Sequence, residues 1–342
     1  MTRPRVLVAM SGGVDSSVAA AVLLERGFDV TGVTLKLWGG DSDSGCCSVS
    51  DVEDARRVAA QLGIPHYVFN FTDDFSNQVV DPYVGAYAAG HTPNPCVECN
   101  RSIKFGRLLD RAHVLGFDLV ATGHHARVVS RRGRYVLERG TDRAKDQSYV
   151  LYMLTQRELP RTVFPVGEFT KAEVRAHAHR LGLRTATKPE SMDVCFVTKG
   201  ARVEFLAARA EMTPGRIVDT SGRAVGGHDG VAAFTVGQRR GLGVASGERR
   251  YVVDIDAVSA TVTIGSKHDL LRHDVALHGL TFVDTRPDRE SLLAQVRAHG
   301  DVADARLRGD VVQFGTPQPR VARGQVVALY DGDVLVGGGI AA

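Results

Sequence analysis

The chain has 342 residues, of which 44% are hydrophobic and 24% are charged, and its formal net charge is +3. This length allows two or three domains with large cores, and no segment approaches the roughly 18 apolar residues of a membrane span. The five cysteines are odd in number and scattered, which argues against a disulfide framework. The N-terminal apolar run is shorter than the roughly 7–15 residues of a signal-peptide core, so we expect a cytoplasmic protein.

Strands and helices alternate from residue 5 to about residue 182. Short apolar runs predict strands at residues 5–10, 28–38, 66–71 and 118–123. Helical periodicity predicts helices at residues 17–27, 48–64 and 102–116. Gly27 is expected to end the first helix, and Ser50 and Glu53 have the spacing of a capping box at the start of the second. The alternation predicts an α/β domain with a doubly wound parallel sheet.

A basic segment follows the last of these strands. Residues 127–146 hold seven Arg or Lys against three Asp or Glu, and two short β-like runs around "SRRG" predict a hairpin. Such charge fits either a nucleic-acid surface or an ordinary solvated edge that resists pairing with other strands. Both interpretations stay open.

The pattern changes after about residue 200. Residues 213–230 are rich in turn-forming residues, residues 249–266 predict a hairpin, and short alternating runs from about residue 272 predict a small antiparallel barrel. We therefore expect a catalytic domain at residues 1–203, a central adaptor domain at 204–270 and a β-barrel domain at 271–342.

The segment "MSGGVDSS", residues 10–17, lies between the first strand and the first helix. Paired glycines let backbone N–H groups approach an anion, and a helix N-terminus adds partial positive charge. The segment is neither a Walker loop nor a dinucleotide fingerprint. It resembles the pyrophosphate loop of the ATP pyrophosphatases, whose fold is of the nucleotide α-hydrolase type. The resemblance implies ATP as a substrate and Asp15 as a carboxylate that helps hold Mg²⁺ on the pyrophosphate.

Five cysteines occur, and three of them carry the argument. Cys96 and Cys99 have C-x-x-C spacing, but no second cysteine or histidine pair completes a zinc site. Redox chemistry, sulfur transfer, or an iron–sulfur cluster with Cys195 as third ligand remain open. Cys195 could also be a buried core thiol. The adjacent Cys46 and Cys47 are interpreted as loop thiols.

Seven segments in order make the resemblance more specific. They are "MSGGVDSS", "HTPNPCVECNRSIKFG", "LVATGHHAR", "KDQSYVLYML", "VCFV", "TVGQRRGLG" and "GQVVALYDGDVLVGGGI". Together they span nearly the whole chain, which resembles the bacterial family of tRNA-specific 2-thiouridylases. The resemblance implies adenylation of the C2 oxygen of the wobble uridine, followed by its replacement with sulfur from a persulfide. It implies tRNA and a sulfur-carrier protein or cysteine desulfurase as partners, and a monomer.

The resemblance also implies roles for individual residues. Cys195 carries the persulfide, Cys99 is the second catalytic cysteine, and the two form a transient disulfide. The expected ATP-binding residues are Ala9, Met10, Ser11, Gly12, Gly13, Val14, Asp15, Ser16, Leu35 and Gly123. The expected contacts to the target base or the tRNA are Asn94, Pro95, Cys96, His124, Lys145, Asp146, Gln147, Arg297, Ala298 and Gln325. For His124 the alternative is a histidine satisfied at a strand end, and Arg297 and Ala298 lie in a loosely matching segment.

The chain departs from the family at Cys96. Well-known members have an aspartate there, assigned as a general acid or base, and a thiol could replace it only with a suitable pKa. Three cysteines also leave an iron–sulfur cluster on Cys96, Cys99 and Cys195 as an alternative source of sulfur.

Other classes fit fewer of these features. An amidotransferase-type synthetase would need an ammonia source and would not require the three cysteines. Lysidine synthetase also acts on tRNA, but it attacks with lysine and does not require them either. An RNA-binding protein without catalysis would explain the hairpin and the barrel but not the phosphate loop.

Overall fold

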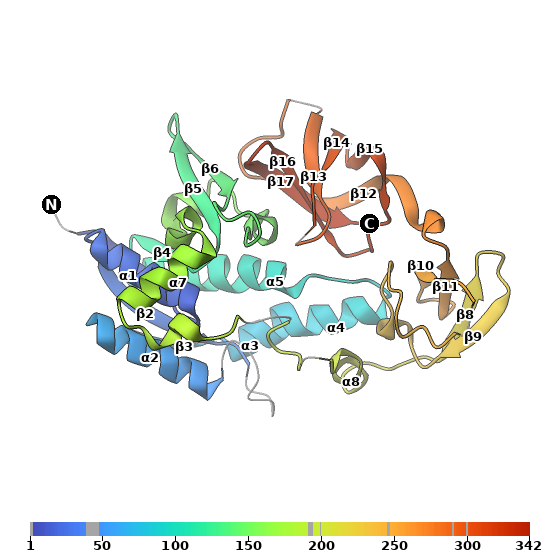
Figure 1. Cartoon of the computed structure of the whole chain (residues 1–342), viewed down its shortest axis with the longest axis horizontal. Coiled ribbons are helices and arrows are strands. Elements are labelled where there is room, and N and C mark those ends of the chain that lie inside the picture. The colour runs from blue at the N-terminus through green and yellow to red at the C-terminus, as the bar shows by residue number, and fades with distance from the viewer. Residues whose placement is uncertain are drawn as a thin grey trace.

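The N-terminal part of the chain forms the expected doubly wound sheet (Figure 1). The computed structural model describes residues 3–38, 48–190, 194–198, 200–244, 247–288, 291–298 and 300–342. Cys46 and Cys47 lie outside the described residues. Five parallel strands have the order β3-β2-β1-β4-β7. They are β1 (Arg5–Ala9), β2 (Asp29–Lys36), β3 (His66–Asn70), β4 (Leu119–Ala121) and β7 (Thr162–Val163).

Both faces of this sheet are covered. Val6 and Val8 of β1 pack against α1 (Val14–Glu25), α2 (Val49–Leu62) and α7 (Lys171–Arg180). Leu7, which points the other way, packs into a second cluster with residues of β2 and of the helices between β3 and β4. The alternation of side chains along β1 therefore supplies two cores from one strand.

The start of α2 differs from the prediction. The helix is capped by Ser48, whose Oγ accepts a hydrogen bond from the Asp51 N–H at 3.1 Å, so the predicted capping box of Ser50 and Glu53 is wrong. Asp51 occupies the third helical position and accepts from the Ser48 hydroxyl at 2.7 Å. Gly63 ends the helix in the left-handed region at φ 69°.

Two helical segments run between β3 and β4. The first contains α3 (Thr72–Phe75), a π-helical stretch (Ser76–Val80) and α4 (Asp81–Ala88). The second contains α5 (Pro95–Glu98), a π-helical stretch (Cys99–Arg107) and α6 (Leu108–Val114). This second segment begins at Pro95, seven residues before the predicted start at residue 102, and it carries Cys96 and Cys99. Proline fits its first position, where a backbone N–H would have no intrahelical partner.

The central part of the chain forms a separate sheet. Its strands have the order β10-β11-β8-β9 and are β8 (Gly215–Asp219), β9 (Ala224–His228), β10 (Tyr251–Asp256) and β11 (Thr261–Gly265). The predicted hairpin at residues 249–266 is confirmed, because β10 and β11 pair antiparallel.

The C-terminal part closes into an antiparallel barrel. Its strands are β12 (Leu271–Phe282), β13 (Ser291–Gln295), β14 (Ala303–Arg308), β15 (Val311–Pro319), β16 (Val326–Asp331) and β17 (Val334–Ala341). Pairing of β12 with β17 closes the barrel. None of the helices in the described part of the chain is long and apolar enough to span a bilayer.

The basic hairpin belongs to this barrel in space. It consists of β5 (Ala126–Arg131) and β6 (Arg134–Arg139), and β6 pairs antiparallel with β17. Apolar residues of the N-terminal part and of the barrel share one core there, with Tyr149 and Tyr330 both fully buried. Because strands from the first part complete the last sheet, the predicted domain limits after residues 203 and 270 stay predictions.

Candidate functional site

The phosphate loop and the segment after β4 meet at one edge of the parallel sheet. β1 is flanked by β2 on one side and β4 on the other, so the loops leaving β1 and β4 face each other at the topological switch point. A Cβ on Gly123 would lie 2.7 Å from the Ser16 nitrogen, and one on Gly12, at φ 73°, would lie 2.3 Å from the Asp51 carbonyl oxygen. Glycine is required at both positions because backbone occupies the space.

The loop itself is held by its own hydroxyl groups. Ser16 Oγ and Ser17 Oγ donate to the Gly13 carbonyl at 3.1 and 2.8 Å, and the Ser11 N–H donates to Ser16 Oγ at 3.2 Å. Gly13 begins α1, and no side chain caps the helix there. The first-turn N–H groups of a twelve-residue helix therefore face the switch point, as an anion site requires.

Asp15 has two partners that the sequence analysis missed. Lys171 Nζ donates to both carboxylate oxygens at 2.7 Å, and His125 Nε2 lies 3.1 Å from Oδ1. Burial opposes ionisation of Asp15, but the hydrogen bonds and charges of His125 and Lys171 outweigh it, and the pKa of Asp15 is lowered. The side chain of Lys171 is 12% exposed and that of Asp15 is 30% exposed. An ionised carboxylate beside an ammonium group thus lies within the predicted phosphate site.

Removing Lys171 should expose the cost of this buried charge. We expect Lys171→Met to lower the free energy of unfolding by about 1–3 kcal/mol at pH 7, because it leaves the Asp15 carboxylate without the ammonium group that bonds to both of its oxygens. Since the Asp15 pKa is depressed below 3.8 in the folded protein, the pair stabilises the fold above that pH and loses its effect as the pH falls. Urea unfolding at pH 7 and at about pH 3, below the ordinary pKa of an aspartate, should therefore show a stability difference between Lys171→Met and the wild type that is smaller in acid.

The exposed pair Arg26–Glu168 provides the control for Lys171→Met. Its atoms approach to 2.7 Å, but the side chains are 38% and 55% exposed. Arg26→Met should cost less than about 1 kcal/mol. An equal loss in both variants, or a Lys171→Met loss independent of pH, would contradict the account of Asp15.

The other residues predicted to bind ATP line the same edge. Ala9 is the last residue of β1 and pairs in register with Val33, so Leu35 lies two residues further along β2 at the carboxyl end of the sheet. Leu35 is 7% exposed and Met10 is 2% exposed. The structure thus brings residues 9–16, Leu35 and Gly123 together, while their contacts with a nucleotide stay a prediction.

Cys99 and Cys195 belong to the same apolar cluster. Cys99 is buried in the core that contains Leu35, and Cys195 packs against the same core together with Ala9. Phe196 follows Cys195 in the sequence, and the centroid of its ring lies 5.5 Å from that of Phe75. Residues almost one hundred positions apart in sequence are therefore gathered on the face of the sheet that adjoins the phosphate loop.

Cys96 lies on the exposed side of the same helical segment. Asn94 caps α5, and its Oδ1 accepts a hydrogen bond from the Cys96 N–H at 3.1 Å. Burial raises the pKa of Tyr83, which belongs to the apolar core that contains Cys99. The centroid of the Tyr83 ring lies 5.3 Å from that of Phe196, the residue that follows Cys195 in the sequence.

The three cysteines do not form a metal-binding set in this arrangement. Across the described ranges of the chain, no three His, Cys, Asp or Glu side chains are placed so that they could hold a metal ion together. An iron–sulfur cluster on Cys96, Cys99 and Cys195 therefore gains no support from the arrangement of these residues, and it stays a prediction.

Several predicted tRNA contacts are engaged within the protein. Asp146 is 6% exposed, pairs with Arg139 at 2.9 Å, and accepts from the Gly140 and Ser148 N–H groups. Gln147 Oε1 accepts from the His125 N–H at 2.9 Å. Lys145 pairs with Glu190 at 2.8 Å. Asp146 and Gln147 therefore position the loop, and contact of these residues with tRNA stays a prediction.

His124 lies inside the protein. It is 8% exposed, its Nδ1 lies 2.6 Å from Thr122 Oγ1, and its ring packs between Phe105 and Phe164. Burial lowers the pKa of His124 well below its ordinary value, so the ring is neutral. These contacts favour the interpretation of a satisfied histidine at the end of β4 over a direct contact with tRNA.

The charge of the basic hairpin window is largely neutralised. Glu138, which is 4% exposed, forms ion pairs with both Arg127 and Arg131. Other carboxylates form ion pairs with four more of the seven cations. Those pairs are Arg134–Asp284, Arg139–Asp146, Arg143–Asp333 and Lys145–Glu190. This segment holds the hairpin to its surroundings and offers little unpaired positive charge to a nucleic acid.

One of the three C-terminal candidates, Gln325, contacts the segment that leads to Asn94. Gln325 Nε2 donates to the Thr92 carbonyl at 2.7 Å. Arg297 is exposed, and a Cβ on Gly237 would lie 3.7 Å from its Nη2 atom. Ala298 packs partly against the core that the hairpin and the barrel share.

Models of three domain families match successive parts of the chain. They are the tRNA methyl transferase HUP domain at residues 4–199, the tRNA methyl transferase PRC-barrel domain at 203–266 and the Aminomethyltransferase beta-barrel domain at 272–341. Proteins named tRNA-specific 2-thiouridylase MnmA match nearly the whole chain. The relative from Roseiflexus sp. (strain RS-1) is 49% identical over 98% of both chains. That from Chloroflexus aurantiacus (strain ATCC 29366 / DSM 635 / J-10-fl) is 49% identical over 98% of this chain and 97% of its own.

Proposed function

The chain belongs to the MnmA family of tRNA-specific 2-thiouridylases, and we propose that it converts the wobble uridine of tRNA to 2-thiouridine in two steps. The first step adenylates the C2 oxygen with ATP, and the second replaces AMP with sulfur. One observation carries this proposal. The apolar cluster that holds Cys99 and Cys195 also holds Leu35 and Ala9, which border the phosphate loop.

Adenylation is needed because the C2 carbonyl of uracil is a poor electrophile, since both flanking nitrogens donate electrons into it. Transfer of AMP to the oxygen turns it into a leaving group and releases pyrophosphate. The N–H groups at the start of α1 and the ammonium group of Lys171 supply positive potential where the pyrophosphate would lie. The target uridine must leave the stack of the anticodon loop to reach this site.

Magnesium fits this site with one protein carboxylate. Mg²⁺ is commonly held by one or two carboxylates together with substrate phosphates, and Asp15 supplies such a carboxylate at the loop. Its low pKa keeps it ionised at neutral pH. When bound, the ion would neutralise charge on the phosphate groups, while Lys171 holds Asp15 in place and His125 orients it.

Sulfur transfer then uses the cysteine pair. A persulfide on Cys195 holds sulfur at the oxidation level of elemental sulfur, so its delivery as sulfide requires two electrons. The Cys99 thiolate provides them when it attacks Cys195 Sγ, which breaks the bond between Sγ and the terminal sulfur. The terminal sulfur leaves with that electron pair as sulfide and bonds to C2, and AMP departs with the oxygen. The Cys99–Cys195 disulfide left behind is reduced by an external thiol before the next turnover.

Cys96 is given no catalytic role in this scheme, because the general acid or base of well-known family members is an aspartate at this position. Cys96 is exposed and its N–H is held by the Asn94 cap, in the segment that we expect to approach the target base. We expect any proton transfer near the base to involve water or the substrate phosphate. The persulfide donor is expected to be a sulfur-carrier protein or a cysteine desulfurase, and the enzyme is expected to act as a monomer.

The purified protein tests the proposal. With tRNA, ATP, Mg²⁺ and a persulfide donor, we expect AMP release that depends on tRNA and one sulfur atom in the product nucleoside. Two of the matching family models carry the name tRNA methyl transferase, so the product mass also separates sulfur exchange from methylation. A gain of 14 mass units (the mass of CH₂) instead of the roughly 16 expected for oxygen replaced by sulfur would overturn the proposal.

A further inference from the structure

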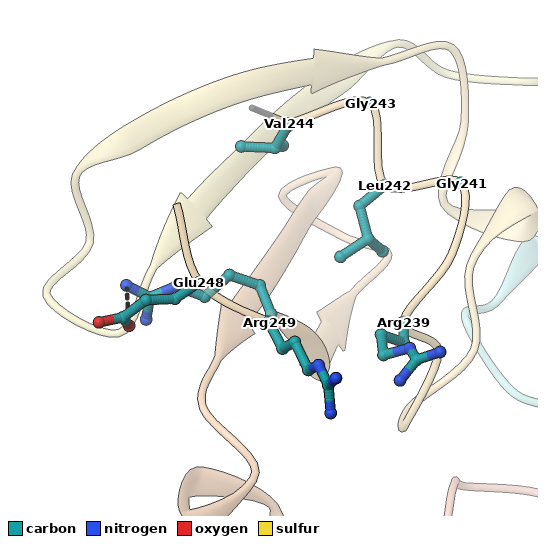
Figure 2. A pocket seen from close by; sticks show the side chains of 8 residues that line it. Arg239, Gly241, Leu242, Gly243, Val244, Glu248 and Arg249 are labelled. Carbon is teal, nitrogen blue, oxygen red and sulfur yellow. Dashed lines mark ion pairs between the residues drawn. The ribbon is translucent and has the colours of Figure 1, made fainter. Parts of the chain in front are cut away.

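A pocket in the central part of the chain is lined by arginines and has no role in the account above. It has a volume of about 420 Å³ and lies in the loop between Val231–Ala233 and β10. Figure 2 shows Arg239 and Arg249 reaching toward the same side of Leu242. The lining residues are Arg239, Gly241, Leu242, Gly243, Val244, Glu248, Arg249 and Arg250.

The loop is built to present these arginines. Leu242 is 8% exposed and anchors the loop in the core of the central sheet. Gly241 and Gly243 flank it at φ 73° and 66°, in the left-handed region that favours glycine. The Gly237 N–H donates to the Val252 carbonyl at 2.8 Å, and the Val252 N–H donates to the Gln238 carbonyl at 2.9 Å. The arginine side chains therefore project from a backbone that is fixed to β10.

The charge of the pocket is unbalanced. Arg250 pairs with Glu248 at 3.5 Å, whereas the described residues provide no carboxylate within ion-pair distance of Arg239 or Arg249, both of which are exposed. This contrasts with the hairpin window, where carboxylates take six of the seven cations. Unpaired guanidinium groups around a concave surface fit an anionic group, which they can bind through two parallel hydrogen bonds.

The pocket also lies beside the approach to the cysteines. Thr235, in the same loop, lies 3.4 Å from Thr92 through their hydroxyl oxygens. Gln325 of the barrel holds the carbonyl of the same Thr92, and Asn94 and Cys96 follow two and four residues later. Arg297 borders the loop at Gly237. A nucleic-acid strand that places a base beside residues 96–99 would therefore pass the loop that carries the arginines.

We propose that this arginine pocket binds backbone phosphate groups of the RNA substrate, on the strand that flanks the target uridine. The inference rests on the proposed function for the identity of that substrate. RNA is favoured over an acidic sulfur-carrier protein because the pocket is concave and its unpaired charge lies next to the path to the base. Phosphate contacts of this kind give affinity and position rather than sequence selectivity.

The test compares a double variant with a matched control. Arg239→Gln with Arg249→Gln removes the two unpaired guanidinium groups, and Arg223→Gln removes an exposed arginine of the same part of the chain that is paired with Asp219 at 3.1 Å. The dissociation constant for tRNA is measured over a series of salt concentrations by filter binding. We expect the double variant to bind tRNA about ten-fold more weakly, with a salt slope lower by about 0.7–0.9 for each lost phosphate contact.

The control should match the wild type in both quantities, and thermal unfolding should show all variants folded. Equal affinity and equal salt slope in the double variant would overturn the proposal. Unchanged tRNA binding with slower uptake of sulfur from the carrier would also overturn it, in favour of a protein-docking surface. Binding is measured without catalysis, so failure of wild-type enzyme to make 2-thiouridine would refute the proposed function and leave this test valid.

Discussion

Replacing Cys195 or Cys99 with serine is expected to abolish 2-thiouridine formation and the AMP release that accompanies it, while adenylation of the tRNA with release of pyrophosphate still occurs. The first step depends on the phosphate loop, and the second depends on sulfur nucleophiles that a hydroxyl group cannot replace, because only a thiolate enters persulfide and disulfide exchange. We expect a loss of at least about 10³-fold in sulfur incorporation for either variant. Incorporation of labelled sulfur and release of pyrophosphate are measured in the same reaction.

Cys96→Ser is the matched control for these variants. It changes a cysteine three residues from Cys99 on the same helical segment, but one that is exposed and outside the core containing Cys99 and Cys195. Sulfur incorporation that survives in Cys99→Ser or in Cys195→Ser would remove that residue from the mechanism. Loss in all three variants, together with iron and sulfide in anaerobically purified wild-type protein, would favour the iron–sulfur alternative instead.

Asp15→Ala is expected to reduce AMP formation by about 10²–10⁴-fold and to abolish thiolation with it. The variant removes the carboxylate proposed to support Mg²⁺ and leaves Lys171, 12% exposed, without its partner at 2.7 Å. AMP release is followed at saturating ATP and tRNA, and the affinity for ATP is measured separately. Asp15→Asn keeps the shape of the side chain and should lose nearly as much activity, since the charge is what the site requires.

Glu25→Ala provides the control for Asp15→Ala. Glu25 ends the same helix α1 at the far side from the loop and pairs with Arg180 at 3.0 Å on the surface. We expect Glu25→Ala to retain AMP formation within about two-fold of the wild type, because an exposed pair contributes little to stability. Normal turnover by Asp15→Ala would refute the assignment of the phosphate loop.

Local sequence patterns were sufficient to predict the strands β1 to β4 and the helices α1 and α2, but not α4 or β7. The strand at residues 5–10, the glycine-rich loop and the helix that Gly27 ends depend on neighbours within a few positions, so propensity and spacing reveal them. The cap of α2 was displaced by two residues because Ser48 and Ser50 both satisfy the pattern, and only the fold selects the hydroxyl that Asp51 reaches.

The chemistry around Asp15 could not be predicted in the same way. Lys171 lies 156 positions away in sequence and reaches Asp15 because α7 packs beside α1. The sequence predicted a functional role for His124 but not for His125. The side chain of His125 reaches Asp15 in the phosphate loop, whereas the ring of His124 packs between two phenylalanines. A pattern of adjacent histidines carries no signal that separates these environments.

The count of Arg and Lys at residues 127–146 suggested a positively charged surface, but carboxylates, some of them distant in sequence, neutralise most of it. Asp284 and Asp333, which neutralise Arg134 and Arg143, belong to the barrel and lie 150 and 190 positions from their partners. The sequence shows the cations as a cluster but not the carboxylates that fold onto them. Arg239 and Arg249, for which the described residues provide no carboxylate partner, lie instead in a loop that composition alone did not distinguish.

Nucleoside mass spectrometry of bulk tRNA tests the central claim most directly. The cells would carry as their only copy either the intact gene or the gene with Cys195→Ser. We predict 2-thiouridine derivatives at the wobble position with the intact gene and the unthiolated nucleoside with the variant. An unchanged level of 2-thiouridine in cells that carry only Cys195→Ser would contradict sulfur transfer through the cysteine pair.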